Sequence, residues 1–168
     1  KSQVIPRILR VNGAVFYYDY RNYQTNQFIA SIASQKLTSL PKARVMGAEV
    51  EVRAEPVRGL VLQLAGGLTD SKITDALDPA LVGNKLPLSE DFNANGSISY
   101  RIETPLGSFT PEFSFKHRGE YFTNKDNDKP LGKFTTYDAA LRYESNGGGI
   151  YGSLWIRNLS DVRKAIIV

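Results

Sequence analysis

Cysteine is absent from the 168-residue sequence, and histidine occurs only once, as His117. The absence of cysteine excludes disulfide bonds, thiolate metal sites and a cysteine nucleophile. A lone histidine makes neither a metal site nor a catalytic triad, and no cofactor-binding motif is present. Long apolar runs are missing as well, since no stretch approaches the roughly 20 consecutive apolar residues of a transmembrane helix. The sequence therefore predicts neither a helical membrane protein nor an enzyme, and it predicts no catalytic residue, metal site or cofactor.

The net charge of +4 comes from lysines and arginines scattered along the chain, without a basic run or a basic helix. A nucleic-acid partner is therefore not expected. Helical periodicity is missing too, because no segment repeats its apolar residues every 3.6 positions over three turns. Any regular structure must come from strands.

Alternation of apolar and polar residues with a period of two marks seven segments as strands. These segments are residues 8–23, 44–55, 60–69, 92–102, 109–122, 134–144 and 150–159. Short turns with Gly or Pro follow the second, fourth and sixth segments, and longer polar stretches (24–42, 70–91 and 123–133) follow the first, third and fifth. The sequence therefore predicts an all-β fold of antiparallel, up-and-down strands, with short turns at one end and long loops at the other. Transmembrane β-barrels have this asymmetry.

The two faces of the predicted sheet differ in polarity. In residues 44–55 the apolar set is Met46, Ala48, Val50 and Val52, and the opposite set is Gly47, Glu49, Glu51 and Arg53. In residues 8–23 the sequence assigns Ala14, Phe16, Tyr18 and Tyr20 to the apolar face and Tyr17, Asp19 and Arg21 to the polar face. The side chain of Trp155 is not assigned to either face. So many charges on one face need water or a polar partner, which the lumen of a wide barrel supplies.

Five pieces of the sequence, taken in order, resemble the C-terminal part of the barrel of TonB-dependent outer-membrane receptors. They are LRVNGAVFYYDYRNYQ (9–24), ARVMGAEVEVRAEPVRGLVLQLAGGLTDS (43–71), GNKLPLSEDFNANGSISY (83–100), HRGEYFTNKDN (117–127) and YGSLWIRNLSDVRK (151–164). The resemblance implies that residues 1–168 are a partial barrel domain, with seven to eight strands of a larger plugged barrel. The family's plug domain, TonB box and final barrel strands are expected to lie outside this sequence.

The resemblance also implies a location and partners. We expect the bacterial outer membrane, contact with its lipid, and a TonB complex that acts through the missing N-terminal part. The expected ligand is a small molecule such as a ferric siderophore. Vitamins, haem and saccharides remain open.

Ligand-binding residues are expected at the long-loop end, where a ligand would first arrive. The charged candidates are Asp19, Arg21, Arg118 and Glu120, and the aromatic candidates are Tyr23, Phe28, Tyr121 and Phe122. A structural explanation exists for both groups, because lumen charges also face plug or water and rings near a membrane surface form interfacial belts.

Two other protein classes fit the strand pattern. A soluble β-sandwich that binds a ligand or carbohydrate would use the apolar face as its core. A small outer-membrane barrel with a structural or adhesive role would close with few strands.

Overall fold

A single antiparallel sheet dominates the structure, which is a computed structural model that describes residues 2–5, 8–29 and 34–163. Its strands are β1 (Ser2–Ile5), β2 (Leu9–Ile29), β3 (Ser34–Ala54), β4 (Leu60–Asp75), β5 (Phe92–Tyr100), β6 (Ile102–Thr104), β7 (Gly107–Arg118), β10 (Phe134–Ser145) and β11 (Tyr151–Ile156). The order is β1-β2-β3-β4-β5-β7-β10-β11, with β6 paired to β7, so neighbours in the sheet are consecutive hairpins. The prediction of an all-β, up-and-down antiparallel fold is confirmed.

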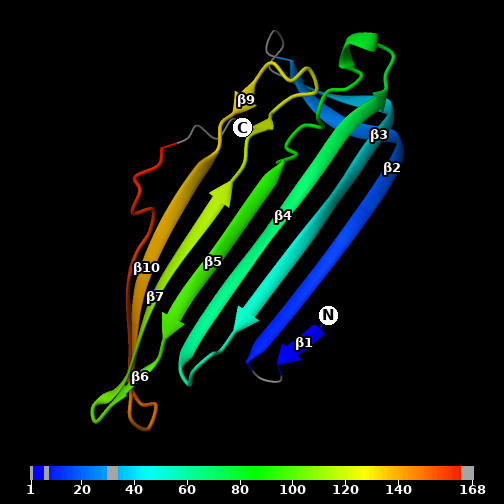
Figure 1. Ribbon diagram of the computed structural model, residues 1–168. Helices are drawn as coiled ribbons and strands as arrows, with labels where there is room; N and C mark the ends of the chain where they lie inside the picture. Colours follow the sequence, from blue (N-terminus) through cyan, green and yellow to red (C-terminus); the bar gives the residue numbers. More distant parts are fainter. Residues whose placement is uncertain (1, 6–7, 30–33, 164–168) are drawn as a thin grey trace.

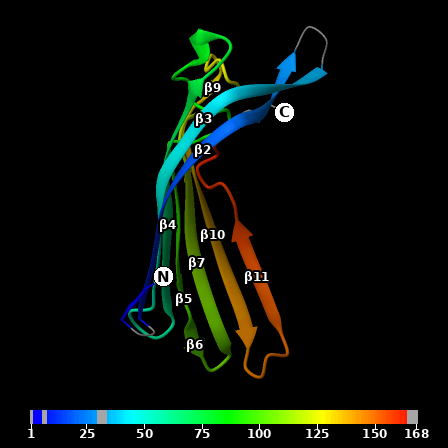
Figure 2. The same ribbon diagram turned by 90° about the vertical axis from the view of Figure 1, so that its right-hand side faces the viewer.

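The sheet has the form of a tilted, curved wall. Figure 1 shows the strands side by side, with tight turns at the lower end and longer connections at the upper end. Figure 2, turned by 90°, shows the curvature of the wall from β2 round to β11. At the upper end, a 3₁₀ turn, η2 (Pro79–Leu81), and a small sheet of β8 (Tyr121–Phe122) and β9 (Pro130–Leu131) stand above the strands. No helix within the described residues is long and apolar enough to cross a membrane.

The tight turns depend on glycines with a left-handed backbone. Gly59 has φ 86°, and its carbonyl accepts a hydrogen bond from the backbone N–H of Arg101 at 2.8 Å. Gly147 and Gly148 have φ 87° and 72° and close the β10–β11 hairpin. Only glycine takes such values without steric cost, so these positions fix the short-turn end of the sheet.

Several predicted strand ends are wrong. The polar stretch 24–42 is not a loop, because β2 and β3 stay paired as far as Ile29 and Ser34. Likewise β4 continues to Asp75, and β7 ends at Arg118, so that residues 121–122 form the separate strand β8. Backbone pairing carries these strands beyond the region where one face is apolar, so the alternation used for the prediction stops before the strands do.

Cross-strand pairing divides the side chains between two faces, which we call the polar face and the apolar face. Residues directly opposite each other in antiparallel strands share a face. Glu51 on β3 lies opposite Ala65 on β4, whereas Val52 lies opposite Leu64 and Leu64 opposite Gly96 on β5. This pairing confirms the predicted faces of the central segments. It also resolves Trp155, which pairs with Ala140 and therefore lies on the polar face.

The faces predicted for β2 are wrong. Ala14 lies opposite Glu49 and Phe16 lies opposite Gly47, so Ala14, Phe16, Tyr18 and Tyr20 belong to the polar face. Tyr17, Asp19 and Arg21 lie opposite Met46, Arg44 and Lys42 and belong to the apolar face. The prediction failed because both sides of β2 carry large rings, so hydrophobicity alone does not tell the two faces apart.

Candidate functional site

Four rings stand one above the other along the polar face of β2, and we call Phe16, Tyr18, Tyr20 and Tyr23 the aromatic ladder. Neighbouring ring centroids are 5.6, 5.9 and 5.7 Å apart. Tyr18 is 51% exposed and Tyr20 is 38% exposed. Spacings of this size are typical of interacting aromatic pairs. The ladder therefore offers an accessible stack of rings that runs from mid-strand towards the long-loop end.

The ladder continues past Tyr20 because Asn22 interrupts the inward–outward alternation of side chains on β2. We call such an interruption by one extra residue a slip. Asn22 has φ 55°, a left-handed value, and the rings of Tyr20 and Tyr23 meet although these residues are three positions apart, which would put them on opposite faces of a regular strand. On the paired strand, Leu40 and Ala43 are likewise three residues apart and both are buried in one cluster. The matching slips keep β2 and β3 paired while Tyr23 and Leu40 turn to the polar face.

A hollow of about 350 Å³ on the polar face adjoins the lower end of the ladder. Its side chains are two carboxylates and three amides together with small residues: Asn12, Ala14, Glu49, Glu51, Ala65, Gly67, Asn93 and Asn95. The Nδ2 atom of Asn12 donates to the Glu51 carboxylate at 2.8 Å. The polar face thus combines rings with carboxylate and amide oxygens, which accept hydrogen bonds from a polar ligand.

An apolar cluster covers the polar face at the long-loop end. Leu40, Ala43 and Ile73 on the strands pack with Leu81 and Leu86 from the β4–β5 connection, and Tyr23 packs against them. The backbone N–H of Leu86 also donates to the buried Ser71 hydroxyl at 3.3 Å. The connection therefore folds over the wall and fixes the upper end of the ladder.

Arg118, at the end of β7, and Tyr121, in β8, come together at the long-loop end of the sheet. The Arg118 guanidinium lies 4.6 Å from the centre of the Tyr121 ring and forms an ion pair with Glu90. Tyr121 is only 9% exposed. Stacking on a buried ring and pairing with a carboxylate hold the guanidinium in one orientation at the edge of the polar face.

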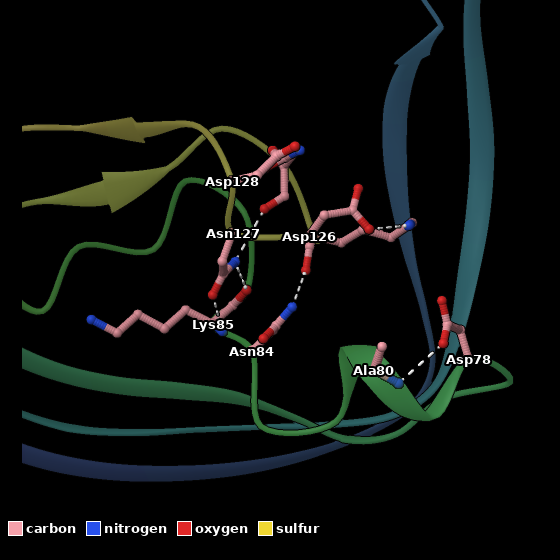
Figure 3. Close-up of polar contacts among 9 residues, drawn as sticks. Asp78, Ala80, Asn84, Lys85, Asp126, Asn127 and Asp128 are labelled. Carbon is pink, nitrogen blue, oxygen red and sulfur yellow. Dashed lines mark hydrogen bonds and ion pairs between the residues drawn. The ribbon is translucent and has the colours of Figure 1, made fainter.

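Two long connections are tied together by the side chain of Asn127 (Figure 3). Its Oδ1 accepts from the Lys85 backbone N–H at 2.8 Å, and its Nδ2 donates to the Lys85 carbonyl at 3.0 Å. The side chain of Asn84 donates to the Lys125 carbonyl at 3.0 Å. These hydrogen bonds join residues 84–85 and 125–127 into one unit.

We expect Asn127→Ala to loosen this unit. The change removes the bonds to Lys85 and places alanine at φ 56°, so the local opening free energy should fall by about 1–2 kcal/mol. Amide hydrogen exchange at Lys85 in the full-length protein should accelerate roughly 5- to 30-fold. Asn127→Gly relieves the backbone and should retain part of that acceleration, whereas Asp126→Asn should leave Lys85 unchanged. Unchanged exchange in Asn127→Ala would show that the side chain does not link the connections.

The predicted site residues separate into groups. Tyr23 packs against the apolar cluster, the Arg118 guanidinium lies over the Tyr121 ring, and Phe122 has the Lys85 ammonium 6.0 Å from its ring centre. Glu120 is exposed at the start of the connection. Asp19 and Arg21 were expected in the lumen but lie on the opposite face. The side chain of Phe28 lies outside the described residues.

The rings of Phe16, Tyr18 and Tyr20 were predicted on the wrong face and were therefore missed as site residues. One signal was available: Gly47 lies directly opposite Phe16, where a side chain would collide with the ring. Among the described residues, no three histidine, cysteine, aspartate or glutamate side chains converge on a point where a metal could bind.

The family model described as "TonB dependent receptor-like, beta-barrel" matches residues 5–159. The chain belongs to this family. It is therefore a section of an outer-membrane barrel, in which the apolar face contacts lipid and the polar face lines the interior. In such barrels the long loops lie at the extracellular end and the short turns at the periplasmic end. Family membership excludes the soluble β-sandwich and the small structural barrel.

Relatives and solved structures cover the same region. The pesticin receptors of Yersinia enterocolitica and Yersinia pestis are 25% identical over 154 residues, which make up 91% of this chain and 22% of each receptor. The ferric yersiniabactin uptake receptor FyuA from Yersinia pestis matches with a TM-score of 0.80 and 22% identity, over 94% of this chain and 23% of that structure. The siderophore receptor PiuA from Acinetobacter baumannii matches with a TM-score of 0.74 and 20% identity, over 95% and 23%. The chain thus spans less than a quarter of the length of these proteins.

Proposed function

We propose that this segment forms wall and extracellular loops of a receptor for TonB-dependent uptake of a ferric siderophore that carries aromatic rings. The observation that carries the proposal is the aromatic ladder on the lumen side of β2, next to carboxylates and amides. The similar proteins include a ferric yersiniabactin uptake receptor and a siderophore receptor, which supports the ligand class.

The ladder gives an aromatic ligand successive places to bind. A planar group of the ligand stacks on Tyr18 or Tyr20, and each such contact contributes about 0.5–1.5 kcal/mol beyond the burial of its area. Because the ring spacing is nearly constant, a ligand loses little free energy when it moves from one ring to the next. The rings therefore bind the ligand and guide it inward, while Asn12, Glu49 and Asn93 receive its hydrogen-bond donors.

The extracellular end supplies the remaining proposed ligand contacts. Arg118 presents a fixed positive charge to an anionic ferric complex, and Tyr121 and Glu90 hold it in place. Tyr23, Glu120 and Phe122 are the further proposed contacts at the extracellular end. Asp19 and Arg21 are not part of the proposed site because they face lipid. The plug and the TonB contact belong to parts of the receptor outside this segment.

Replacing Tyr18 and Tyr20 with alanine in the full-length receptor should weaken binding of a ferric catecholate siderophore. Loss of two stacking surfaces amounts to about 1–3 kcal/mol, which raises Kd roughly 5- to 150-fold. Kd is measured by quenching of receptor fluorescence, and uptake is measured with radioactive iron. Tyr18→Phe with Tyr20→Phe keeps the rings and should bind nearly as well as the unmodified receptor.

Tyr17→Ala is the matched control, because Tyr17 adjoins Tyr18 in the chain but lies on the apolar face. We expect its Kd to be unchanged. A ferric hydroxamate siderophore, which lacks aromatic rings, tests the ligand class. If Tyr17→Ala impairs catecholate binding as much as the double substitution, or if hydroxamate binds more tightly than catecholate, the proposal is wrong.

A further inference from the structure

The Glu90 carboxylate, which pairs with Arg118, is the most shielded carboxylate among the ion pairs of the described residues. The Glu90 side chain is 16% exposed, whereas that of Glu112, which pairs with Arg142, is 27% exposed. The Arg118 side chain is 37% exposed, so a ligand reaches the cation more easily than the anion. Water screens an exposed ion pair strongly and a covered one much less. Glu90 therefore offsets a large part of the positive charge of Arg118.

The backbone holds Glu90 in place from both sides. Before it, the N–H of Leu88 donates to the carbonyl oxygen of Phe122 at 2.8 Å. After it, the carbonyl oxygen of Asp91 accepts from the N–H of Thr69 at 2.9 Å. These two bonds attach the segment to β8 and β4, so the carboxylate cannot leave Arg118 without strain on backbone hydrogen bonds.

Arg118 is fixed as well. Its Nε atom donates to the Glu90 carboxylate, and its guanidinium lies over the Tyr121 ring. The N–H of the next residue, Gly119, donates to the carbonyl oxygen of Phe92 at 2.8 Å. Within the described part of the chain, Nε is the only atom of this guanidinium that donates a hydrogen bond, so its Nη atoms remain available to a ligand. Arg118 and Glu90 together form a rigid couple that has no net charge but keeps open donors.

Such a couple discriminates between anionic ligands. An arginine without a carboxylate attracts any anion, including a compact one such as phosphate. Coulomb repulsion falls with distance, so Glu90 opposes a compact anion at Arg118 more strongly than a large ferric complex whose charge is spread out. The large complex also gains from stacking on aromatic rings, which phosphate lacks. Repulsion of the wrong ligand contributes to specificity together with attraction of the right one.

We infer that Glu90 is a specificity-determining residue of the proposed ligand site, where its carboxylate excludes compact anions that carry no rings. The inference rests on the proposed function, because it requires that the siderophore complex contacts Arg118. A shielded ion pair adds little to stability, since removing both charges from water costs about as much free energy as their attraction provides. Exclusion of compact anions gives this pair a role in binding instead.

The test measures competition between inorganic phosphate and a ferric catecholate siderophore for the full-length receptor at constant ionic strength. Fluorescence quenching gives the Kd of the siderophore, and the rise of this Kd with phosphate gives the inhibition constant of phosphate. We expect Glu90→Gln to lower the inhibition constant at least about fivefold, and to lower the siderophore Kd by a smaller factor. Glutamine still accepts a hydrogen bond from the Arg118 Nε atom, so the guanidinium keeps its orientation. Glu90→Asp draws the carboxylate back and should give an intermediate inhibition constant.

Asp91→Asn is the matched control, because it makes the same change of charge at the next residue, whose carboxylate pairs with Lys85. We expect it to keep the inhibition constant of the unmodified receptor. Circular dichroism melting identifies any variant that has lost its fold, and Glu90→Asp then provides the decisive comparison. The inference is overturned by an inhibition constant that does not change in either Glu90 variant, or that falls as far in Asp91→Asn.

Arg118→Gln separates this inference from the proposed function. An unchanged siderophore Kd in Arg118→Gln would remove Arg118 from the ligand site, and the role of Glu90 with it. If Arg118→Gln weakens siderophore binding while Glu90→Gln leaves the phosphate inhibition constant unchanged, the proposed site stands and only the role of Glu90 is wrong.

Discussion

Leu64→Arg in the full-length receptor should lower the free energy of unfolding by about 2–4 kcal/mol, the cost of an arginine on the lipid face near the bilayer midplane. Leu64 is 49% exposed on the wall and is flanked across the sheet by Val52 and Gly96. No carboxylate on the apolar face lies in this row to pair with the new charge. Guanidinium titration of the receptor folded in lipid vesicles measures the change.

Ala65→Arg is the neighbouring control on the opposite face. Ala65 lies between Glu51 and Asn95, so an arginine there meets a carboxylate and the polar interior of the barrel. We expect a change below about 1 kcal/mol, in the range of an exposed ion pair. If both substitutions cost the same, the division of β4 into a lipid face and a lumen face is incorrect.

Gly47→Ala is the second change with a large expected effect. A methyl group at this position would lie 2.3 Å from the carbonyl oxygen of Leu68 and 2.5 Å from the Cζ atom of Phe16. The oxygen belongs to the backbone of the adjacent strand, so β3 and β4 must separate locally. Overpacking of this kind costs about 3 kcal/mol. The substitution also displaces the Phe16 ring, so catecholate affinity should fall together with stability.

Gly67→Ala provides the comparison on the same face of the next strand. A methyl group there would meet the side chains of Asn93 and Glu49 at 3.4–3.6 Å, which is close to ordinary contact with groups that can move. We expect the free energy of unfolding to change by less than about 1 kcal/mol. Similar losses for the two glycines would mean that strand packing at Gly47 is looser than the structure shows.

Much of the wall could be predicted from sequence because lipid and lumen impose opposite polarity on successive residues. Within residues 44–55 the predicted strand and its two predicted faces agree with β3, because Glu49 and Glu51 alternate with Met46, Ala48 and Val50. The β2 faces could not be predicted because the lumen side there is aromatic. Aromatic residues that line the interior have the same hydrophobicity as residues that face lipid, so hydrophobicity alone does not distinguish the two faces.

The extracellular site depended on contacts between distant segments. Arg118 and Tyr121 are close in sequence, and their chemistry suggested a site. Glu90, which pairs with Arg118, and Asn127, which joins Lys85, gave no local signal. Such pairings depend on how two long connections fold over the end of the sheet, and no periodicity encodes that.

The paired slips at Asn22 and beside Ala43 have a consequence for exchanging extracellular hairpins between related receptors. Below Asn22 the strands obey the polarity of the membrane, whereas above it the inward and outward positions are exchanged. A graft joined below Asn22 must therefore carry both slips. Deleting Asn22 alone would leave Pro41 on β3 without an opposite residue, because Arg21 pairs with Lys42 and Tyr23 with Leu40, so the two strands would lose their matched register above this point. The safe junction lies between Tyr23 and the hairpin tip.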